Sequence, residues 1–153
     1  MRFIGTTETK VDPKGRTVIP VAFRRVLKEH GEERVVLRKD DFQPCLVIYP
    51  ESVWSALVDT VRARLNRWDP QQQMMFRQFV SDVEVQTLDS AGRILIPRRY
   101  LQMAAIDTAV KIIGMDDSME LWADDGSGKP FMEPADFVKA MQQIMNPEND
   151  NDR

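Results

Sequence analysis

One ten-residue motif occurs twice in the chain and contains residues whose types and spacing could bind a ligand. The first copy is VDPKGRTVIP (residues 11–20) and the second is LDSAGRILIP (residues 88–97), so five of ten positions are identical. Gly15 and Gly92 occupy the same position in the two copies, and glycine can take the positive φ that a tight chain reversal needs. The repeated motif therefore predicts two structured loops.

Each predicted loop also holds an arginine at a fixed place. Asp12 and Asp89 can accept backbone N–H bonds across the turn, so Arg16 and Arg93, four residues later, should be held in a defined direction. A guanidinium held in this way suits bidentate contact with a guanine edge or with phosphate. The alternative is structural, with each arginine paired to the aspartate of its own loop as an internal clamp. The residues alone leave both interpretations open.

The repeat extends beyond the motif and predicts an α+β fold. Each motif is followed by a short helix-like stretch, two strand-like runs and a longer amphipathic helix, which gives β–turn–β–α–β–β–α twice. The expected helices are 21–30, 51–68, 98–105 and 134–145, and the strand-like runs after the motifs are 34–38, 46–49, 110–113 and 119–122. Units of about 75 residues are near the small end of independent stability, so they should share a core or pack on neighbouring chains.

These patterns divide the chain into four segments. We expect a first repeat with its C-terminal helix (1–68), a connecting helix (69–82), a second repeat with its C-terminal helix (83–145) and a disordered polar tail (146–153). The connecting segment is strongly apolar at Met74, Met75, Phe76 and Phe79. This cluster favours a place in the intrachain core, and packing between subunits is the alternative.

The charge of the chain is unevenly distributed. The net charge is −3, but residues 1–39 carry ten Lys or Arg against five acidic residues, and the remainder therefore sums to −8. A basic surface on an acidic body is typical of a DNA-binding protein. A solvated surface of mixed charge would give the same counts.

Catalytic and metal-binding functions are poorly supported. His30 is the only histidine and falls at the end of a charged helix, and Cys45 lies in an apolar run where a buried, unreactive thiol is expected. These two residues cannot form a zinc site, and Pro130 interrupts the phosphate-loop-like Gly126–Lys129. We expect no enzyme, no metal and no cofactor. A single cysteine and the lack of an 18-residue apolar run suit a cytoplasmic protein.

Four segments together resemble the MraZ family, whose members are bacterial transcriptional regulators built from two SpoVT-AbrB domains. They are the two motifs, CLVIYP (45–50) and Glu120–Trp122, and their order and spacing match from about Phe3 to Met145. The resemblance implies two tandem swapped-hairpin, AbrB-like β-barrel units with flanking helices. It also implies ring-shaped homo-oligomers and binding to short direct repeats in the promoter of the division and cell-wall gene cluster.

The family's Asp-x-x-x-Arg signature falls on both loops, but the loops are unequal. The first contains Lys14, where the second has Ala91, and further basic residues lie near the first loop in sequence. We therefore expect the first loop to be the main DNA contact, with Arg16 at bases and Lys14 on phosphate, and the second to assist or to serve in assembly. The expected DNA-binding residues are Arg16, Lys14, Lys10, Arg24, Arg25 and Arg93, and the loop-structuring residues are Asp12, Gly15, Asp89 and Gly92.

The resulting expectation is a cytoplasmic, nucleoid-associated transcriptional regulator that represses its own operon. Its partners should be double-stranded promoter DNA and other copies of itself in a closed ring, with no membrane or small-molecule substrate. The alternative is an oligomeric structural or protein-interaction scaffold without DNA binding, in which the two arginine loops are only structural clamps.

Overall fold

The structure, a computed structural model, describes residues 1–146, so the expected polar tail lies outside the described residues except for Asn146. The expected order of elements is found twice, with a helix between the repeats where a connecting helix is expected. The elements are β1 (Thr6–Lys10), β2 (Arg16–Val18), α1 (Val21–Glu29), β3 (Arg34–Lys39), β4 (Leu46–Pro50), α2 (Glu51–Ala63), α3 (Pro70–Ser81), β5 (Glu84–Thr87), β6 (Arg93–Leu95), α4 (Arg98–Met103), β7 (Ala109–Gly114), β8 (Met119–Ala123) and α5 (Pro134–Met145).

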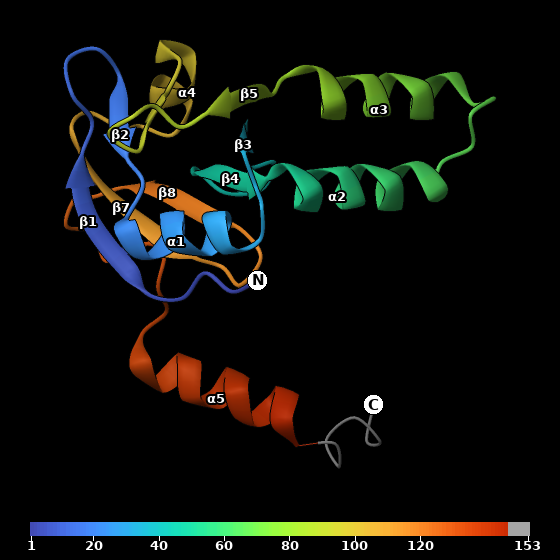
Figure 1. Ribbon diagram of the computed structural model, residues 1–153. Helices are drawn as coiled ribbons and strands as arrows, with labels where there is room; N and C mark the ends of the chain where they lie inside the picture. The colour runs from blue at the N-terminus through green and yellow to red at the C-terminus, as the bar shows by residue number, and fades with distance from the viewer. Residues whose placement is uncertain (147–153) are drawn as a thin grey trace.

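Strands of the two repeats alternate in space. A six-stranded antiparallel sheet has the order β1-β7-β8-β4-β3-β5, and β2 pairs with β6 in a separate two-stranded ribbon. The first strand of each repeat thus pairs with the hairpin of the other repeat, β1 with β7 and β5 with β3 (Figure 1). Interchanging the repeats leaves these pairings unchanged, so an approximate twofold axis relates the two halves of the chain.

The two repeats share one apolar core, as their small size predicts. Ile19 and Leu37 from the first repeat and Ile96 and Leu121 from the second belong to the same cluster, each at most 2% exposed. The short helices contribute their apolar faces, since α1 buries Phe23 and Leu27 and α4 buries Tyr100. Neither repeat could complete this core with its own strands alone, because each sheet edge is supplied by the other repeat.

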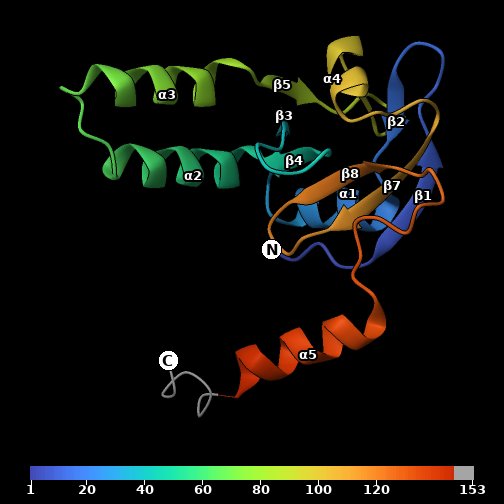
Figure 2. The ribbon, with the colours of Figure 1, turned by 180° about the vertical axis from the view of Figure 1, so that it is seen from behind.

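Three helices extend away from the sheet. Helices α2 and α3 run side by side, and α5 lies apart from both of them and from the sheet (Figures 1 and 2). Helix α2 ends at Ala63 rather than at the expected Trp68, because the chain reverses there and the Asn66 side chain accepts a hydrogen bond from the backbone N–H of Trp68 at 3.0 Å. Asp69 then caps α3 through the N–H groups of residues 71 and 72.

The expectation that the connecting segment enters the intrachain core is wrong for its methionines. Met74 is 64% and Met75 is 48% exposed, and α3 contains no buried residue. Phe79 is partly covered by Trp54 of α2, with ring centroids 5.1 Å apart. Helix α2 likewise contains no buried residue, so the two helices cover each other only in part.

Candidate nucleic-acid interface

The two motif loops have the same backbone geometry. In the first, the N–H of Gly15 donates to the carbonyl of Asp12 at 2.9 Å and the N–H of Asp12 donates to the carbonyl of Arg16 at 2.8 Å. Gly15 has φ +86° and Gly92 has φ +78°, as their position in the motif predicts. This is a tight turn followed by a left-handed glycine, which joins strands whose twist it matches.

The aspartate of each loop forms the clamp that the structural interpretation predicts. Oδ1 of Asp12 accepts from the backbone N–H groups of Lys14 at 3.0 Å and Arg16 at 2.8 Å, and Oδ2 accepts from Nε of Arg16 at 2.8 Å. Asp89 repeats the pattern, with Oδ1 to the N–H groups of Ala91 and Arg93 at 2.9 Å each and Oδ2 to Nε of Arg93 at 2.8 Å. Both loops are therefore fixed by one carboxylate.

Hydrogen bonding also explains the acidity of these carboxyl groups. The backbone N–H of Arg16, followed by the Arg16 side chain and the backbone N–H of Lys14, holds the pKa of Asp12 below its ordinary value. The backbone N–H of Arg93 is likewise the largest cause of the lowered pKa of Asp89. Both aspartates are therefore charged, and the clamps closed, over the whole neutral range.

The clamps orient the arginines without using all of their donors. Each guanidinium is held only through Nε, and within residues 1–146 the two terminal nitrogens of Arg16 and of Arg93 have no hydrogen-bond partner. Their side chains are 30% and 32% exposed, respectively. The structural and the DNA-binding interpretations are thus compatible, because the clamp leaves a planar pair of donors free for an external acceptor.

Both arginines lie on one face of the β2–β6 ribbon. Arg16 is opposite Leu95 and Arg93 is opposite Val18, with Thr17 opposite Ile94 between them. Successive side chains of a strand point to opposite faces, and the middle pair is buried at 1% exposure. The outer face therefore presents the two arginines diagonally across the ribbon. Spacing along the chain does not reveal this neighbourhood, because it arises from pairing between residues 75 to 79 positions apart.

The other predicted basic residues lie in different places around this ribbon. Lys14, Lys10 and Arg25 are exposed, on the first loop, on β1 and on α1, respectively. Arg24 does not accompany the first loop, as sequence proximity suggests, but packs against the second. A Cβ built on Gly92 would lie 2.5 Å from Cδ of Arg24. The reason is the strand exchange, which brings α1 to the loop of the other repeat.

Comparison with known proteins places the chain that carries these loops in a family. The family model described as "MraZ protein, putative antitoxin-like" matches residues 2–78 and 79–126 of the chain. The chain belongs to the MraZ family. It is 51% identical over 152 residues to the "Transcriptional regulator MraZ" of Bacteroides thetaiotaomicron, covering 99% of this chain and 97% of the relative. The protein of the same name from Phocaeicola vulgatus is 50% identical, with 97% of each chain covered, and that of Flavobacterium psychrophilum is 29% identical, with 97% and 95% covered.

Arg99 of this MraZ-family chain, one of two adjacent arginines at 98–99, serves the fold instead of the outer surface. Nη2 of Arg99 donates to Asp82 at 2.8 Å and to Glu84 at 3.2 Å, and the guanidinium lies 4.6 Å from the ring centroid of Tyr100. The hydrogen bond from Arg99 is the largest cause of the lowered pKa of Asp82. Burial, together with the neighbouring carboxylate, raises the pKa of Tyr100 to about 12. Arg98 has no hydrogen bond or ion pair of its side chain within residues 1–146, in contrast to Arg99.

Cys45 and His30, which were considered above for catalysis or metal binding, are part of the folded scaffold. Cys45 is fully buried, and burial raises the pKa of its thiol to about 12, so the thiolate is scarce at neutral pH. Nδ1 of His30 lies 3.0 Å from the carbonyl of Val26, at the C-terminal end of α1. Among residues 1–146 no cluster of three or more His, Cys, Asp or Glu could hold a metal ion. No helix in the same range is long and apolar enough to cross a membrane.

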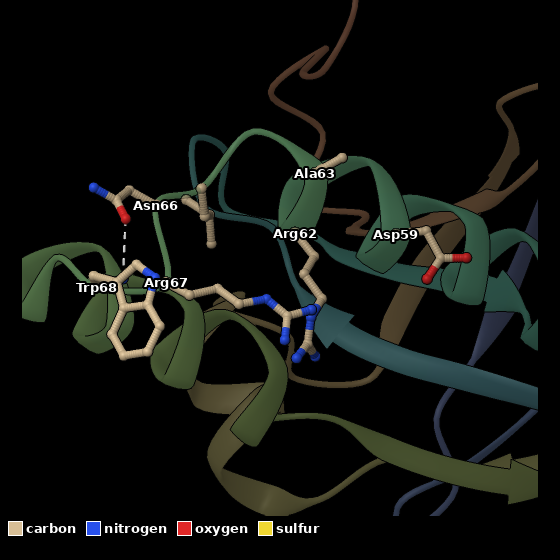
Figure 3. Close-up of a pocket in the computed structure, with 7 residues that line it drawn as sticks. Asp59, Arg62, Ala63, Asn66, Arg67 and Trp68 are labelled. Carbon is tan, nitrogen blue, oxygen red and sulfur yellow. Dashed lines mark hydrogen bonds between the residues drawn. The ribbon is translucent and has the colours of Figure 1, made fainter.

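A second basic surface lies far from the ribbon, at the tip of the α2–α3 pair. A hollow of about 570 Å³ is lined there by Asp59, Arg62, Asn66, Arg67 and Trp68 among others, and Figure 3 shows Arg62 and Arg67 directed between the two helices. The guanidinium of Arg62 lies 5.6 Å from the ring centroid of Phe76. Trp68 is 92% exposed beside this hollow. None of these residues belongs to the repeated motif, so no pattern in the sequence singles them out.

Proposed function

We propose that this protein is a sequence-specific DNA-binding transcriptional regulator. The observation that supports it best is the outer face of the β2–β6 ribbon, where two arginines are oriented by clamps and their terminal nitrogens have no partner among the described residues 1–146. The major groove of B-DNA admits a two-stranded β-ribbon, and bidentate contact from Arg to guanine is the commonest specific interaction there. The names of the MraZ relatives support the same function.

The roles of the basic residues follow from their positions. Arg16 is the main base-contacting residue, and the exposed Lys14 beside it binds phosphate. Arg93 makes the corresponding contact from the second loop. Lys10 and Arg25 add longer-range attraction to the phosphate backbone. Asp12, Gly15, Asp89 and Gly92 shape the loops and do not themselves contact DNA.

The biological setting is also a proposal. We expect the protein to act in the cytoplasm on the nucleoid, to bind short direct repeats in the promoter of its own division and cell-wall operon, and to repress that operon. The names of the relatives support regulation of transcription but specify neither the genes nor the sign of the effect.

We further propose that the interleaved strands are two swapped-hairpin units of the AbrB kind that together form a barrel. The chain segments 1–68, 69–82, 83–145 and 146–153 remain the proposed organisation along the sequence. The strand exchange between β1 and β7 and between β5 and β3 supports the swapped arrangement.

Assembly into a closed ring is proposed from uncovered apolar surface. On α5, Phe137 is 55% and Ile144 is 75% exposed, and Met74 of α3 is 64% exposed. Apolar patches of this kind usually mark contact surfaces. Unlike faces that contact head to tail generate a ring when the rotation closes.

The alternative function is an oligomeric scaffold without DNA binding, and the Asp12–Arg16 clamp is the observation that favours it. A gel-shift assay separates the two functions. The probes are a duplex from immediately upstream of the protein's own gene and a shuffled duplex of equal composition, each at low and at physiological salt. At physiological salt, a regulator binds the upstream duplex more tightly than the shuffled duplex. Absence of binding to either duplex at low salt would establish the scaffold instead.

A further inference from the structure

Arg24 lies across the second loop in a way that the repeat does not predict. Its position corresponds to Leu101 in the second repeat, at the offset of 77 residues. A Cβ on Gly92 would lie 2.5 Å from Cδ, 2.6 Å from Nη1 and 2.7 Å from Cζ of Arg24. The corresponding position on Gly15 has only the carbonyl of Ile96 at 3.0 Å and a carbon of Leu95 at 3.7 Å. Glycine at 92 therefore leaves the space that the Arg24 side chain occupies.

The Arg24 guanidinium is held in the same manner as those of the loop arginines. Its Nε donates to the carbonyl of Ile19 at 2.9 Å, and its terminal nitrogens have no hydrogen-bond partner within residues 1–146. Arg38 and Arg99, in contrast, use their terminal nitrogens on Asp41 and Asp82. Arg16, Arg93 and Arg24 thus form a group around the ribbon in which Nε is anchored and the outer donors are free.

The balance of charge indicates what Arg24 replaces. The first loop has two cations, Lys14 and Arg16, for the single carboxylate of Asp12. The second loop has Ala91 in place of the lysine, and without Arg24 it would have one cation for the one carboxylate of Asp89. Arg24 restores the excess positive charge from the opposite repeat.

We propose that Arg24 is the phosphate-binding cation of the second loop, and that both loops of one chain contact opposite strands of a single DNA box. This inference rests on the proposed function. The twofold of the ribbon interchanges the two loops, and B-DNA has a local twofold that interchanges its strands. When the two axes coincide, Lys14 with Arg16 faces one strand and Arg24 with Arg93 faces the other. The inequality of lysine and arginine gives each box a direction, so boxes can still be repeated in tandem.

Phosphate-ethylation interference on the upstream duplex tests the proposal directly. With the unmodified protein, ethylation at positions on both strands within each box should block binding. Arg24→Ala should remove interference at one strand and Lys14→Ala at the other. Each variant should also lower the magnitude of the slope of log affinity against log salt by about 0.9 per box. Interference confined to one strand with the unmodified protein would overturn the proposal.

A compensating substitution guards against a folding defect in Arg24→Ala. Ala91→Lys places a lysine at the position equivalent to Lys14, so the double variant R24A/A91K should regain the salt slope and the lost interference. Arg77→Ala on α3 removes the same charge far from the ribbon and should bind as the unmodified protein does. If R24A/A91K binds no better than Arg24→Ala, or if Arg24→Ala binds as the unmodified protein does, the proposal is wrong.

Failure of the proposed function gives a different result. If Arg16→Ala also binds the upstream duplex unchanged, the ribbon does not contact DNA at all. If Arg16→Ala loses binding while Arg24→Ala and Arg93→Ala keep it, DNA binding stands and the contribution of the second loop is refuted.

Discussion

Thr17 lies opposite Ile94 at the centre of the β2–β6 ribbon, and each residue is 1% exposed. The hydroxyl of Thr17 donates to the carbonyl of Lys10 at 3.2 Å, and Ile94 joins the shared apolar core. The approximate twofold passes between these two residues, because it interchanges the pairs on either side of them. The buried inner face of the ribbon thus holds the outer arginines in a fixed relation.

Ile94→Ala should strongly destabilise the protein. Removing a large buried side chain from a shared core costs about 2–5 kcal/mol in the free energy of unfolding. Leu95→Ala is the matched control, since Leu95 is the next residue along β6, is 53% exposed and should change that free energy by no more than about 0.5 kcal/mol. Urea unfolding at a fixed protein concentration measures both. Equal losses would show that the inner face is not part of the core.

Arg16→Ala should abolish most specific DNA binding and leave the fold intact. The turn persists because the Asp12 carboxylate still accepts the backbone N–H groups of residues 14 and 16. Loss of a bidentate base contact costs about 1–3 kcal/mol per site, and several subunits would multiply the effect. Binding is measured by fluorescence anisotropy on the upstream duplex, and folding by circular dichroism. Unchanged affinity would remove Arg16 from the interface.

Lys14→Ala should weaken binding to upstream and shuffled duplexes to a similar degree. A phosphate contact carries no sequence information, and its loss lowers the slope of log affinity against log salt by about 0.9. A salt titration on both duplexes makes the measurement. Should the variant discriminate poorly between the duplexes at an unchanged slope, Lys14 would be a base contact instead.

The Asp12 clamp should open only in acid. The folded-state pKa lies below the unfolded value of about 3.9, so the stabilisation is complete above that value and is lost as pH falls through the lowered pKa. A carboxyl carbon NMR titration should give a midpoint for Asp12 below its ordinary value. In Arg16→Ala the midpoint should rise part of the way back, because the backbone donors remain. A midpoint at or above the ordinary value would contradict the clamp.

The spacing of DNA boxes should matter as much as their number. In the proposed ring, neighbouring subunits would offer their ribbons in the same rotational sense, so boxes about 10 bp apart would face the protein together. Inserting about half a turn between two boxes should damage binding nearly as much as deleting one, whereas a full turn should be tolerated better, because linked contacts raise avidity on the order of 10². Gel shifts on these duplexes provide the test. Equal affinity for one box and for the array would mean that the subunits act independently.

Local features of the loops could be predicted from the sequence, because they depend on residues close together in the chain. The positive φ of Gly15 and Gly92 follows from the turn that Asp and Gly favour, and the order of the elements follows from the apolar periodicity of each repeat. The family could be predicted for the same reason, since its motifs are short segments that the chain contains in order.

Only the tertiary structure decided which of these local features are neighbours. The sharing of one ribbon face by Arg16 and Arg93, and the contact of Arg24 with Gly92, result from strand exchange between the repeats. Tertiary packing also decides that, within residues 1–146, apolar residues of α3 and α5 are exposed although their periodicity resembles that of core helices. Apolar patterns determine which face of an element avoids water, but the choice of partner depends on packing between distant segments, which no local pattern contains.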